Sequence, residues 1–412
     1  TVSLPLMVPR RPFLIMSPVL LTEVGSPTMH QSSFSPRAFK VSHTLTVPST
    51  AGPSSSLVSK KAMLMAGLAH ADTNSSHATT MAARDAFMSL APWLSRFMLQ
   101  SRRKKAERNA RAIAALLSGA RDLWQDLALR SGGADLLQHQ GCLYLYETEK
   151  AFQAAQADMA YRRGLGVAVD LIGPQELSQL EPNLPDMAGA AYFSGAAFLS
   201  DPGAMMRCLA EAALSYAGFL TARVDRLTRD FDGILLEGSG FRVRAKKAIL
   251  CAGAHSRALA AMAGDKVPLE TERGYHLEWD MPAPVLNRPA CPSARGFYLC
   301  PMTGRLRVAG TVELGGLTAP PSQHRIDKLI EGARAFFPDL GAPDRPWMGF
   351  RPSMPDSRPV IGPSRFGDDV IHAYGHGHIG VTLAPITAQL VADVVARVAP
   401  SRDLTPYRVN RF

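Results

Sequence analysis

Hydrophobic residues recur every three or four positions in several stretches of this chain, from about Ala91 onward. This spacing is typical of helices that bury one face. Helices are predicted over residues 106–129, 150–164, 174–180 and 325–337. Asp201 and Pro202 predict the start of another helix that ends near Tyr216, because aspartate caps helix N-termini and proline suits the first helical position.

Shorter runs of alternating or continuous apolar residues predict β-strands. These runs cover residues 141–146, 220–227, 267–278, 296–300 and 306–313. Gly238-Ser239-Gly240 separates two more apolar runs and predicts a hairpin turn. Because side chains alternate along a strand, Tyr275 and His276 are expected on opposite faces.

The most informative pattern is an apolar strand that runs into glycines and then into an apolar helix. The strand covers residues 370–374, the glycines are Gly375, Gly377 and Gly380, and the helix ends near Val398. Glycines allow a ligand to approach the backbone closely. The helix N-terminus offers free N–H groups and the positive end of a dipole. The pattern therefore indicates a site for an anionic or electron-rich ligand edge.

A second motif, Gly349-Phe350-Arg351-Pro352, precedes these glycines. Together the two motifs resemble the FAD-dependent amino-acid oxidoreductases of the D-amino-acid oxidase, glycine oxidase and D-amino-acid dehydrogenase group, with the bacterial dehydrogenase branch most similar. The resemblance covers residues 91–412 and not residues 1–84. It implies an α/β fold, in which a Rossmann-like FAD-binding domain is interleaved with an α+β substrate domain built on an antiparallel sheet.

The resemblance divides the chain into five parts. Residues 1–84 are anomalous, and residues 91–200 form mainly the helical part of the substrate domain. Residues 201–265 belong to the FAD-binding domain, residues 266–345 to the antiparallel sheet, and residues 346–412 to the C-terminal part of the FAD-binding domain.

The first 84 residues are rich in Ser, Thr and Pro, and most of them show neither helical nor strand periodicity. The family implies a strand, the sequence G-x-G-x-x-G and a helix at this place, with an acidic residue further on. None of these is recognisable, so the βαβ start of the FAD-binding domain is missing from the sequence pattern. A transit peptide, a disordered extension and a mistranslated, frame-shifted segment are the three explanations; we favour the last, because the family pattern begins abruptly.

The resemblance also assigns site residues. Arg351 pairs with the substrate carboxylate, for which a guanidinium fork is well matched. Tyr275 hydrogen-bonds the amino acid, as Tyr298 could, or alternatively lies in the core with its hydroxyl satisfied. We expect no metal, because the histidines lack the spacing with carboxylates that a metal site needs.

The cofactor in this family is FAD, and the resemblance places several residues beside it. Val224 lies near the adenine, and Gly253 follows a buried strand next to the dinucleotide. The flavin ring is lined by the glycine loop, whose members are Gly375, His376, Gly377, His378, Ile379, Gly380 and Thr382. The two loop histidines are expected to pack or hydrogen-bond beside the ring.

The implied reaction is oxidative deamination of an amino acid, with the D-configuration favoured, to a 2-oxo acid and ammonia by hydride transfer to flavin N5. The electron acceptor is either oxygen or a quinone. The alternative is a non-catalytic remnant or interaction protein of the same family that cannot hold FAD, because the N-terminal G-x-G-x-x-G segment is absent.

Charge and cysteine content change this picture little. The net charge of +10 is shared between residues 1–84, with seven basic and two acidic side chains, and the rest of the chain. Residues 102–108 carry five basic side chains and one acidic, without the aromatic readers of a nucleic-acid face. We therefore expect no nucleic acid, and we keep open peripheral contact with an anionic membrane.

The five scattered cysteines favour a reducing compartment, so we expect a cytoplasmic protein, with the inner face of the plasma membrane as the alternative.

Overall fold

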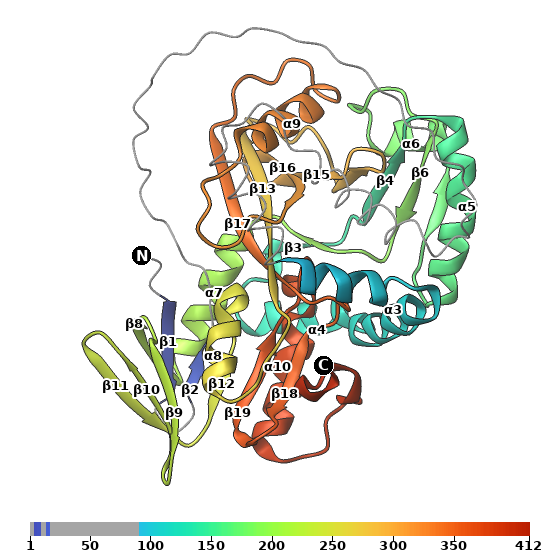
Figure 1. The fold of residues 1–412 in the computed structure, drawn as a ribbon. Coiled ribbons are helices and arrows are strands. Elements are labelled where there is room, and N and C mark those ends of the chain that lie inside the picture. Colours follow the sequence, from blue (N-terminus) through green and yellow to red (C-terminus); the bar gives the residue numbers. More distant parts are fainter. Residues whose placement is uncertain (1–3, 10–13, 17–89) are drawn as a thin grey trace, which may run out of the picture.

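Two β-sheets with helices on their faces dominate this computed structural model, which describes residues 4–9, 14–16 and 90–412. The six-stranded sheet lies in the lower half of Figure 1, and the eight-stranded sheet lies in the upper half. Strands of the eight-stranded sheet both precede and follow strands of the six-stranded sheet along the chain. The α/β fold with two interleaved parts is thus confirmed.

The six-stranded sheet has the strand order β18-β19-β12-β2-β1-β8. Its strands are β1 Leu4–Pro9, β2 Leu14–Met16, β8 Ala217–Ala222, β12 Ala248–Leu250, β18 Val360–Ser364 and β19 Gly367–Tyr374. β12 runs parallel to β19 and to β2. β8 is parallel to them as well, because β1 pairs antiparallel with both β2 and β8. The carboxyl ends of β8, β12 and β19 therefore lie at one edge of the sheet.

The strands β1 and β2 lie within the first 84 residues, where we expected little regular structure. β2 takes the place beside β12, with Ile15 opposite Ile249. Pairing at this place satisfies backbone groups that an open strand edge would leave without partners. The remainder of residues 1–84, and with it the prediction of a disordered or mistranslated segment, lies outside the described residues.

The eight-stranded sheet has the order β17-β13-β16-β15-β14-β4-β6-β5. Its strands are β4 Cys142–Tyr146, β5 Asp170–Ile172, β6 Gly189–Phe193, β13 Glu270–Asp280, β14 Ala290–Pro292, β15 Phe297–Met302, β16 Arg305–Glu313 and β17 Arg345–Ser353. β13 pairs antiparallel with β16 on one side and with β17 on the other. The expected antiparallel sheet is present, and β17 crosses the domain boundary that we placed at residues 345 and 346.

Helices cover both faces of the eight-stranded sheet. They are α5 Glu149–Gly164, α6 Pro174–Leu180 and α9 Gln323–Arg334. Ala190 of β6 shares a hydrophobic cluster with Leu277 of β13 and Leu329 of α9. The next residue, Ala191, lies in a different cluster with Met159 of α5. Since neighbouring strand residues point to opposite faces, α9 and α5 lie on opposite sides of the sheet.

The six-stranded sheet is covered in the same way. Ile371 of β19 packs with Leu116 and Leu383, which belong to α3 and α10. Its neighbour Val370 packs on the other face with Leu259 of α8. The covering elements are α3 Arg103–Leu117, α4 Ala120–Arg130, α8 Ser256–Met262, α10 Gly380–Ala396 and the small sheet of β9 Arg226–Asp230, β10 Gly233–Gly238 and β11 Phe241–Ala245.

The remaining described elements are short, apart from α7. They are α7 Pro202–Leu214, the strand pair β3 Leu137–Gln138 and β7 Phe198–Leu199, and the 3-10 turns Ala134–Leu136, Gly253–His255, Thr405–Tyr407 and Val409–Arg411; residues 90–100 are also helical. The predicted start of α7 is confirmed, because the Asp201 side chain accepts a hydrogen bond from the Ala204 N–H at 3.0 Å.

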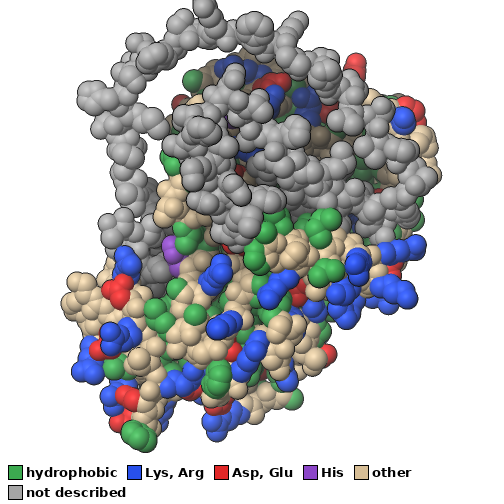
Figure 2. Space-filling view, viewed as in Figure 1, with side chains coloured by type: hydrophobic (Ala, Val, Ile, Leu, Met, Phe, Trp, Pro, Cys, Tyr) green, Lys and Arg blue, Asp and Glu red, His purple; other side chains and the backbone are tan. Residues whose placement is uncertain are grey.

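The single helix predicted over residues 106–129 is instead two helices, α3 and α4. The break falls at Gly119, whose φ of +75° suits glycine and few other residues. In the space-filling view, Lys and Arg side chains gather over the region of α3 (Figure 2). No helix in the described stretches is both long and apolar enough to cross a membrane.

Candidate active site

Three residues that the resemblance assigned to the cofactor lie at one edge of the six-stranded sheet. Val224 comes just after β8, Gly253 just after β12 and Gly375 directly after β19. The predicted strand over residues 220–227 is interrupted here, because β8 ends at Ala222 and β9 begins at Arg226. In open α/β sheets, ligands bind outside the carboxyl ends of the strands. This edge is therefore the candidate cofactor site.

The loop after β19 packs closely against the end of β17. The N–H of Gly377 donates to the Pro352 carbonyl at 2.8 Å. Gly375 and Gly377 have φ values of +83° and +55°. A Cβ at Gly375 would lie 2.9 Å from Cγ of Met354. Glycine at these positions therefore brings the cofactor edge directly against the strand that carries Arg351.

Helix α10 begins at this loop without a side-chain cap. Its N-cap residue is Ile379, which offers no oxygen to the N–H groups of the first turn. Within the helix, Pro385 has no N–H to donate to the Val381 carbonyl. The indole N–H of Trp124 on α4 donates to that carbonyl instead, at 3.0 Å. The start of α10 thus presents free donors while α4 fixes its position.

The two loop histidines have different surroundings. His376 hydrogen-bonds through Nε2 to the Thr387 hydroxyl at 3.0 Å, and burial lowers its pKa to about 4. It is therefore neutral at neutral pH. The His378 side chain is 45% exposed, and its Nε2 lies 2.8 Å from Oε2 of Glu272, whose side chain is fully buried.

Arg351 lies on β17 directly opposite Glu272 of β13. Its side chain crosses Gly274, where a Cβ would lie 2.1 Å from Cζ of the guanidinium. Nη1 donates to the Thr311 carbonyl at 2.8 Å. Thr311 has a φ of +58° and lies where the pairing of β13 with β16 is irregular. This irregular backbone directs the carbonyl at the guanidinium.

No carboxylate of the described residues forms an ion pair with Arg351. Within the described part of the chain, no carboxylate oxygen lies within 4 Å of its guanidinium. Burial lowers the pKa of Arg351, and the negative charge of Glu272 opposes that shift. An arginine remains protonated under such conditions. The site therefore holds a half-buried cation that can accept an anionic ligand.

Trp347 and His276 continue the same face of the sheet. Trp347 lies over Gly349, where a Cβ would lie 1.9 Å from its ring. It stacks on the His276 ring with a centroid separation of 4.6 Å, and it is 47% exposed. Gly349 pairs with Gly274, so two facing glycines make room for two large side chains. The result is an aromatic wall beside Arg351.

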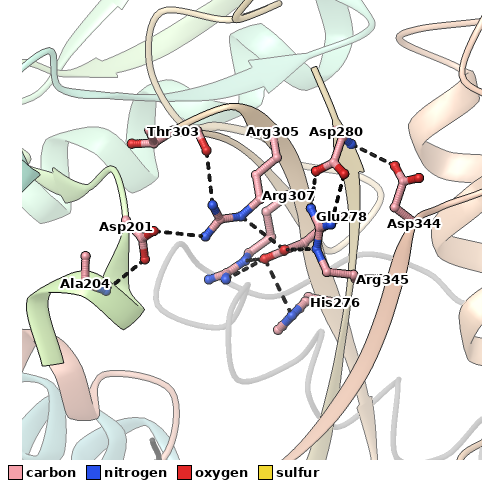
Figure 3. Close-up of polar contacts among 10 residues, drawn as sticks. All are labelled: Asp201, Ala204, His276, Glu278, Asp280, Thr303, Arg305, Arg307, Asp344 and Arg345. Atoms are coloured by element: carbon pink, nitrogen blue, oxygen red, sulfur yellow. Dashed lines mark hydrogen bonds and ion pairs between the residues drawn. The ribbon is translucent and has the colours of Figure 1, made fainter. Parts of the chain in front are cut away.

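Next to His276 lies a network of charged side chains centred on Glu278 (Figure 3). Its carboxylate, 6% exposed, pairs with Arg305, Arg307 and Arg345. Burial pushes the pKa of Glu278 up, but the three guanidinium groups outweigh it, so the net shift is downward. Since these ion pairs join β13, β16 and β17, they hold the three strands in register.

Tyr275 lies on the opposite face of β13 from Arg351 and His276. Its hydroxyl donates to the Glu313 carboxylate and accepts from the Ser322 N–H at 2.9 Å. Its ring belongs to the core cluster under α9. The structure therefore does not bring Tyr275 together with Arg351, and the arrangement matches the alternative of a core tyrosine with a satisfied hydroxyl.

Tyr298 lies on the Arg351 face instead. It pairs with Ala309, which is also the partner of His276. Its hydroxyl hydrogen-bonds to the Tyr144 hydroxyl at 2.8 Å. Tyr298 is thus the better placed of the two tyrosines that the sequence indicated.

The sequence interpretation missed four residues of the site: Glu272, Thr311, Trp347 and Ser353. Glu272 had a detectable signal, because strand alternation places it on the same face as Gly274 and His276. Thr311 had none, since its role depends on a backbone irregularity. No group of three or more His, Cys, Asp or Glu side chains that could hold a metal occurs in the part of the chain that the structure describes.

The fold and this edge define a flavin-dependent oxidoreductase. The chain belongs to the FAD dependent oxidoreductase family, whose model matches residues 62–394. The match begins within the first 84 residues, earlier than the resemblance that we recognised from residue 91.

The relatives have related activities in their names. The chain is 32% identical over 333 residues to D-amino-acid oxidase of Bradyrhizobium diazoefficiens, covering 78% of each. It is 29% identical to D-amino acid dehydrogenase 2 of Ralstonia nicotianae, covering 78% of this chain and 80% of the relative. Among solved structures, glycine oxidase of Geobacillus kaustophilus is 27% identical with a TM-score of 0.66, over 72% of this chain and 82% of that one.

The residues at the edge fit FAD. The Ser353 hydroxyl is buried and has no hydrogen-bond partner among the described residues, and it lies 3.7 Å from where a Cβ of Gly377 would be. Open space surrounds the Cβ position of Gly253, with no neighbouring atom within 4 Å. Free helix N–H groups, an unpaired hydroxyl and this space suit a polar, anionic dinucleotide.

Proposed function

We propose that this chain oxidises an α-amino acid, with the D-configuration preferred, to an imine that water converts to a 2-oxo acid and ammonia. The observation that carries this proposal is Arg351, a half-buried cation held beside the cofactor edge without a carboxylate partner in the described residues. FAD, when bound, supplies the acceptor for the hydride that leaves Cα. The names of two relatives support the D-configuration.

The role of Arg351 is to bind and orient the substrate carboxylate. A guanidinium presents parallel N–H groups that match the two oxygens of a carboxylate. The Thr311 carbonyl holds Nη1, so the fork has a fixed direction before substrate arrives. Fixed orientation of the substrate accounts for much of the rate in a reaction of this kind.

The proposal also covers the electron acceptor and contact of the enzyme with a membrane. Oxygen and a quinone are the two acceptors that we propose. A lipid-soluble quinone is reached at a membrane surface, and a basic run at residues 102–108 follows the exposed side chains of Met98 and Leu99. Comparing oxygen uptake with reduction of a water-soluble quinone identifies the acceptor, and sedimentation with anionic vesicles tests the membrane contact.

The second candidate is a family member that holds no FAD and catalyses nothing. The absence of G-x-G-x-x-G from residues 1–84, where the family resemblance implies it, favours this candidate. It predicts a colourless protein that stays colourless with added FAD.

The deciding experiment is the visible absorption spectrum of the purified full chain. Flavin bands that bleach under anaerobic conditions on adding D-amino acids, and less with the L-enantiomers, support the proposed oxidation. Bands that bleach equally with both enantiomers contradict the D-preference. Bands that no amino acid bleaches contradict the oxidation itself.

A further inference from the structure

We propose that Glu272 and His378 form the site for the substrate's α-ammonium group, and that His378 takes one proton from it. This inference rests on the proposed amino-acid oxidation and deepens it. Oxidation at Cα requires the amine as a free base, whereas an amino acid in neutral solution is a zwitterion. A group that holds the ammonium and removes one of its protons lets the protein use the zwitterion, which is the abundant form.

The geometry brings two distant segments together at this point. Glu272 lies on β13, directly opposite Arg351 in the strand pairing. His378 lies on the loop between β19 and α10, 106 positions along the chain from Glu272, and its Nε2 is 2.8 Å from the carboxylate oxygen Oε2. The pair thus connects the strand that faces the carboxylate anchor with the loop that borders the cofactor edge.

The charges of this pair and of Arg351 match a zwitterion. Arg351 supplies a cation for the carboxylate, and Glu272 supplies an anion next to it. A carboxylic acid that lacks an amine would meet the attraction of Arg351 and the repulsion of Glu272 together. An α-amino acid satisfies both charges, because its ammonium lies on the carbon next to its carboxylate. The site therefore selects α-amino acids over simple carboxylates.

The histidine is oriented for a proton transfer. A carboxylate acceptor at Nε2 favours the tautomer that carries its proton on Nε2 and leaves a lone pair on Nδ1. An ammonium N–H bond then breaks while an Nδ1–H bond forms, and the amine keeps the electron pair. The imidazolium produced is stabilised by Glu272, as in other carboxylate–histidine pairs. No oxidant or reductant takes part in this step.

Three other titratable side chains among the described residues lie on the elements around the Glu272–His378 pair. On β17 the neighbouring charge is Arg351, which stays protonated. On the same loop, His376 is neutral above about pH 4, where burial has lowered its pKa. On β13, Arg273 alternates to the opposite face from Glu272 and contacts Glu313. The proton transfer is therefore assigned to the Glu272–His378 pair.

The first test compares the binding of two probes to the holoenzyme. 2-Aminoisobutyrate has the zwitterion but no Cα–H, so it binds without being oxidised, and isobutyrate lacks the amine. Glu272→Gln keeps the shape of the side chain and removes its charge. Calorimetry should show roughly tenfold weaker binding of 2-aminoisobutyrate and tighter binding of isobutyrate in this variant.

The outcomes separate the two proposals. If Glu272→Gln shifts both probes in the same direction, or neither, the ammonium site is wrong while the carboxylate anchor stands. If the unmodified protein binds neither probe, the carboxylate anchor and the proposed function fail together. His324→Gln, an exposed histidine on α9, should bind both probes like the unmodified protein.

The second test is the pH profile of His378→Gln. At neutral pH we expect kcat/KM to fall by roughly 100-fold or more, the usual contribution of a positioned acid–base group. The loss should shrink about tenfold with each pH unit as the substrate amine loses its proton in solution, and the variant should approach the unmodified enzyme in base. A loss that is constant across pH would overturn the proton-transfer role.

Discussion

The two faces of strand β13 carry out different tasks although their residues alternate along one segment. The face with Glu272, Gly274 and His276 holds charges, glycines and the side chain of Arg351. The other face, with Tyr275 and Leu277, packs under α9. Every second residue therefore serves the site and the intervening ones serve the core.

This alternation couples the site to the core physically. A slip of one residue in strand pairing would move Gly274 and its neighbours into the core and the apolar set into the site. The ion pairs of Glu278 and the paired glycines both depend on the same register. The packing of the core face therefore fixes the positions of the side chains on the site face. Variants of either face can test this coupling.

The largest effect is expected for Arg351→Lys on the site face. A lysine ammonium cannot form the planar fork, so kcat/KM for a D-amino acid should fall. A loss of about 2–5 kcal/mol is typical for a buried charge pair, which is roughly 30- to 5,000-fold. Steady-state kinetics of the flavin-loaded variant measure it. Arg334→Lys, on the exposed surface of α9, should change kcat/KM little, and an equal loss in both would contradict the role of Arg351.

The next effect is expected for Gly274→Ala, also on the site face. The new methyl would lie 2.1 Å from Cζ of Arg351, so the guanidinium must move. A displacement of about 1 Å can cost roughly 100-fold in rate. Kinetics should show that loss while thermal unfolding changes little. Gly164→Ala, where no atom lies within 4 Å of the Cβ position, is the control, and unchanged kinetics in both variants would refute the close contact.

On the core face, Tyr275→Phe should affect stability more than activity. It leaves the Ser322 N–H and the Glu313 carboxylate without the hydroxyl. The expected cost is about 1–3 kcal/mol in the free energy of unfolding, read from denaturant titration. Activity per folded molecule should stay nearly constant. A large rise in KM would instead place Tyr275 in the substrate site, as the family resemblance first suggested.

The smallest effect is a pH dependence of stability from His276 on the site face. Burial, with help from the charge of Arg307, lowers its pKa to about 4. The unfolded chain, with an ordinary value near 6.5, therefore binds more protons between these two pH values. Stability is complete above about pH 6.5 and is lost as pH falls toward 4, by about 1 kcal/mol per pH unit. Denaturation midpoints at pH 7 and pH 5 should differ less in His276→Gln than in the unmodified protein; equal slopes would contradict this.

Local signals in the sequence predicted local structure well. Asp201 and Pro202 predicted the start of α7, and Gly238-Ser239-Gly240 predicted the hairpin of β10 and β11. The opposite orientation of Tyr275 and His276 followed from strand alternation alone. Each of these signals depends on residues within a few positions of one another.

The break between α3 and α4 shows where such signals fail. Apolar spacing continues across Gly119, and one glycine costs a helix only about 1 kcal/mol. Periodicity therefore does not reveal that the chain turns there with a φ of +75°. The packing of α3 and α10 against the sheet determines where the helix breaks. A short stretch of sequence does not reveal this packing.

For the site, the sequence pointed to Arg351 and not to the residues around it. Arg351 and the loop glycines belong to recognisable motifs. The contact of Glu272 with His378 joins segments 106 residues apart, so it exists only after both sheets have formed. The carbonyl of Thr311 reaches Arg351 because of an irregular strand pairing that no motif encodes.

Because of the proline in α10, a tryptophan lies beside the cofactor edge, where its fluorescence can report FAD binding. Because Pro385 cannot donate to the Val381 carbonyl, the indole of Trp124 does so, next to the first turn of the helix at the cofactor edge. Flavins absorb in the range where indoles emit, so this tryptophan, one of four in the chain, should dim when FAD binds. The tryptophan emission of the unmodified protein would then follow cofactor binding in real time without an added label. Trp124→Phe is the control, because the part of the signal that it lacks belongs to Trp124.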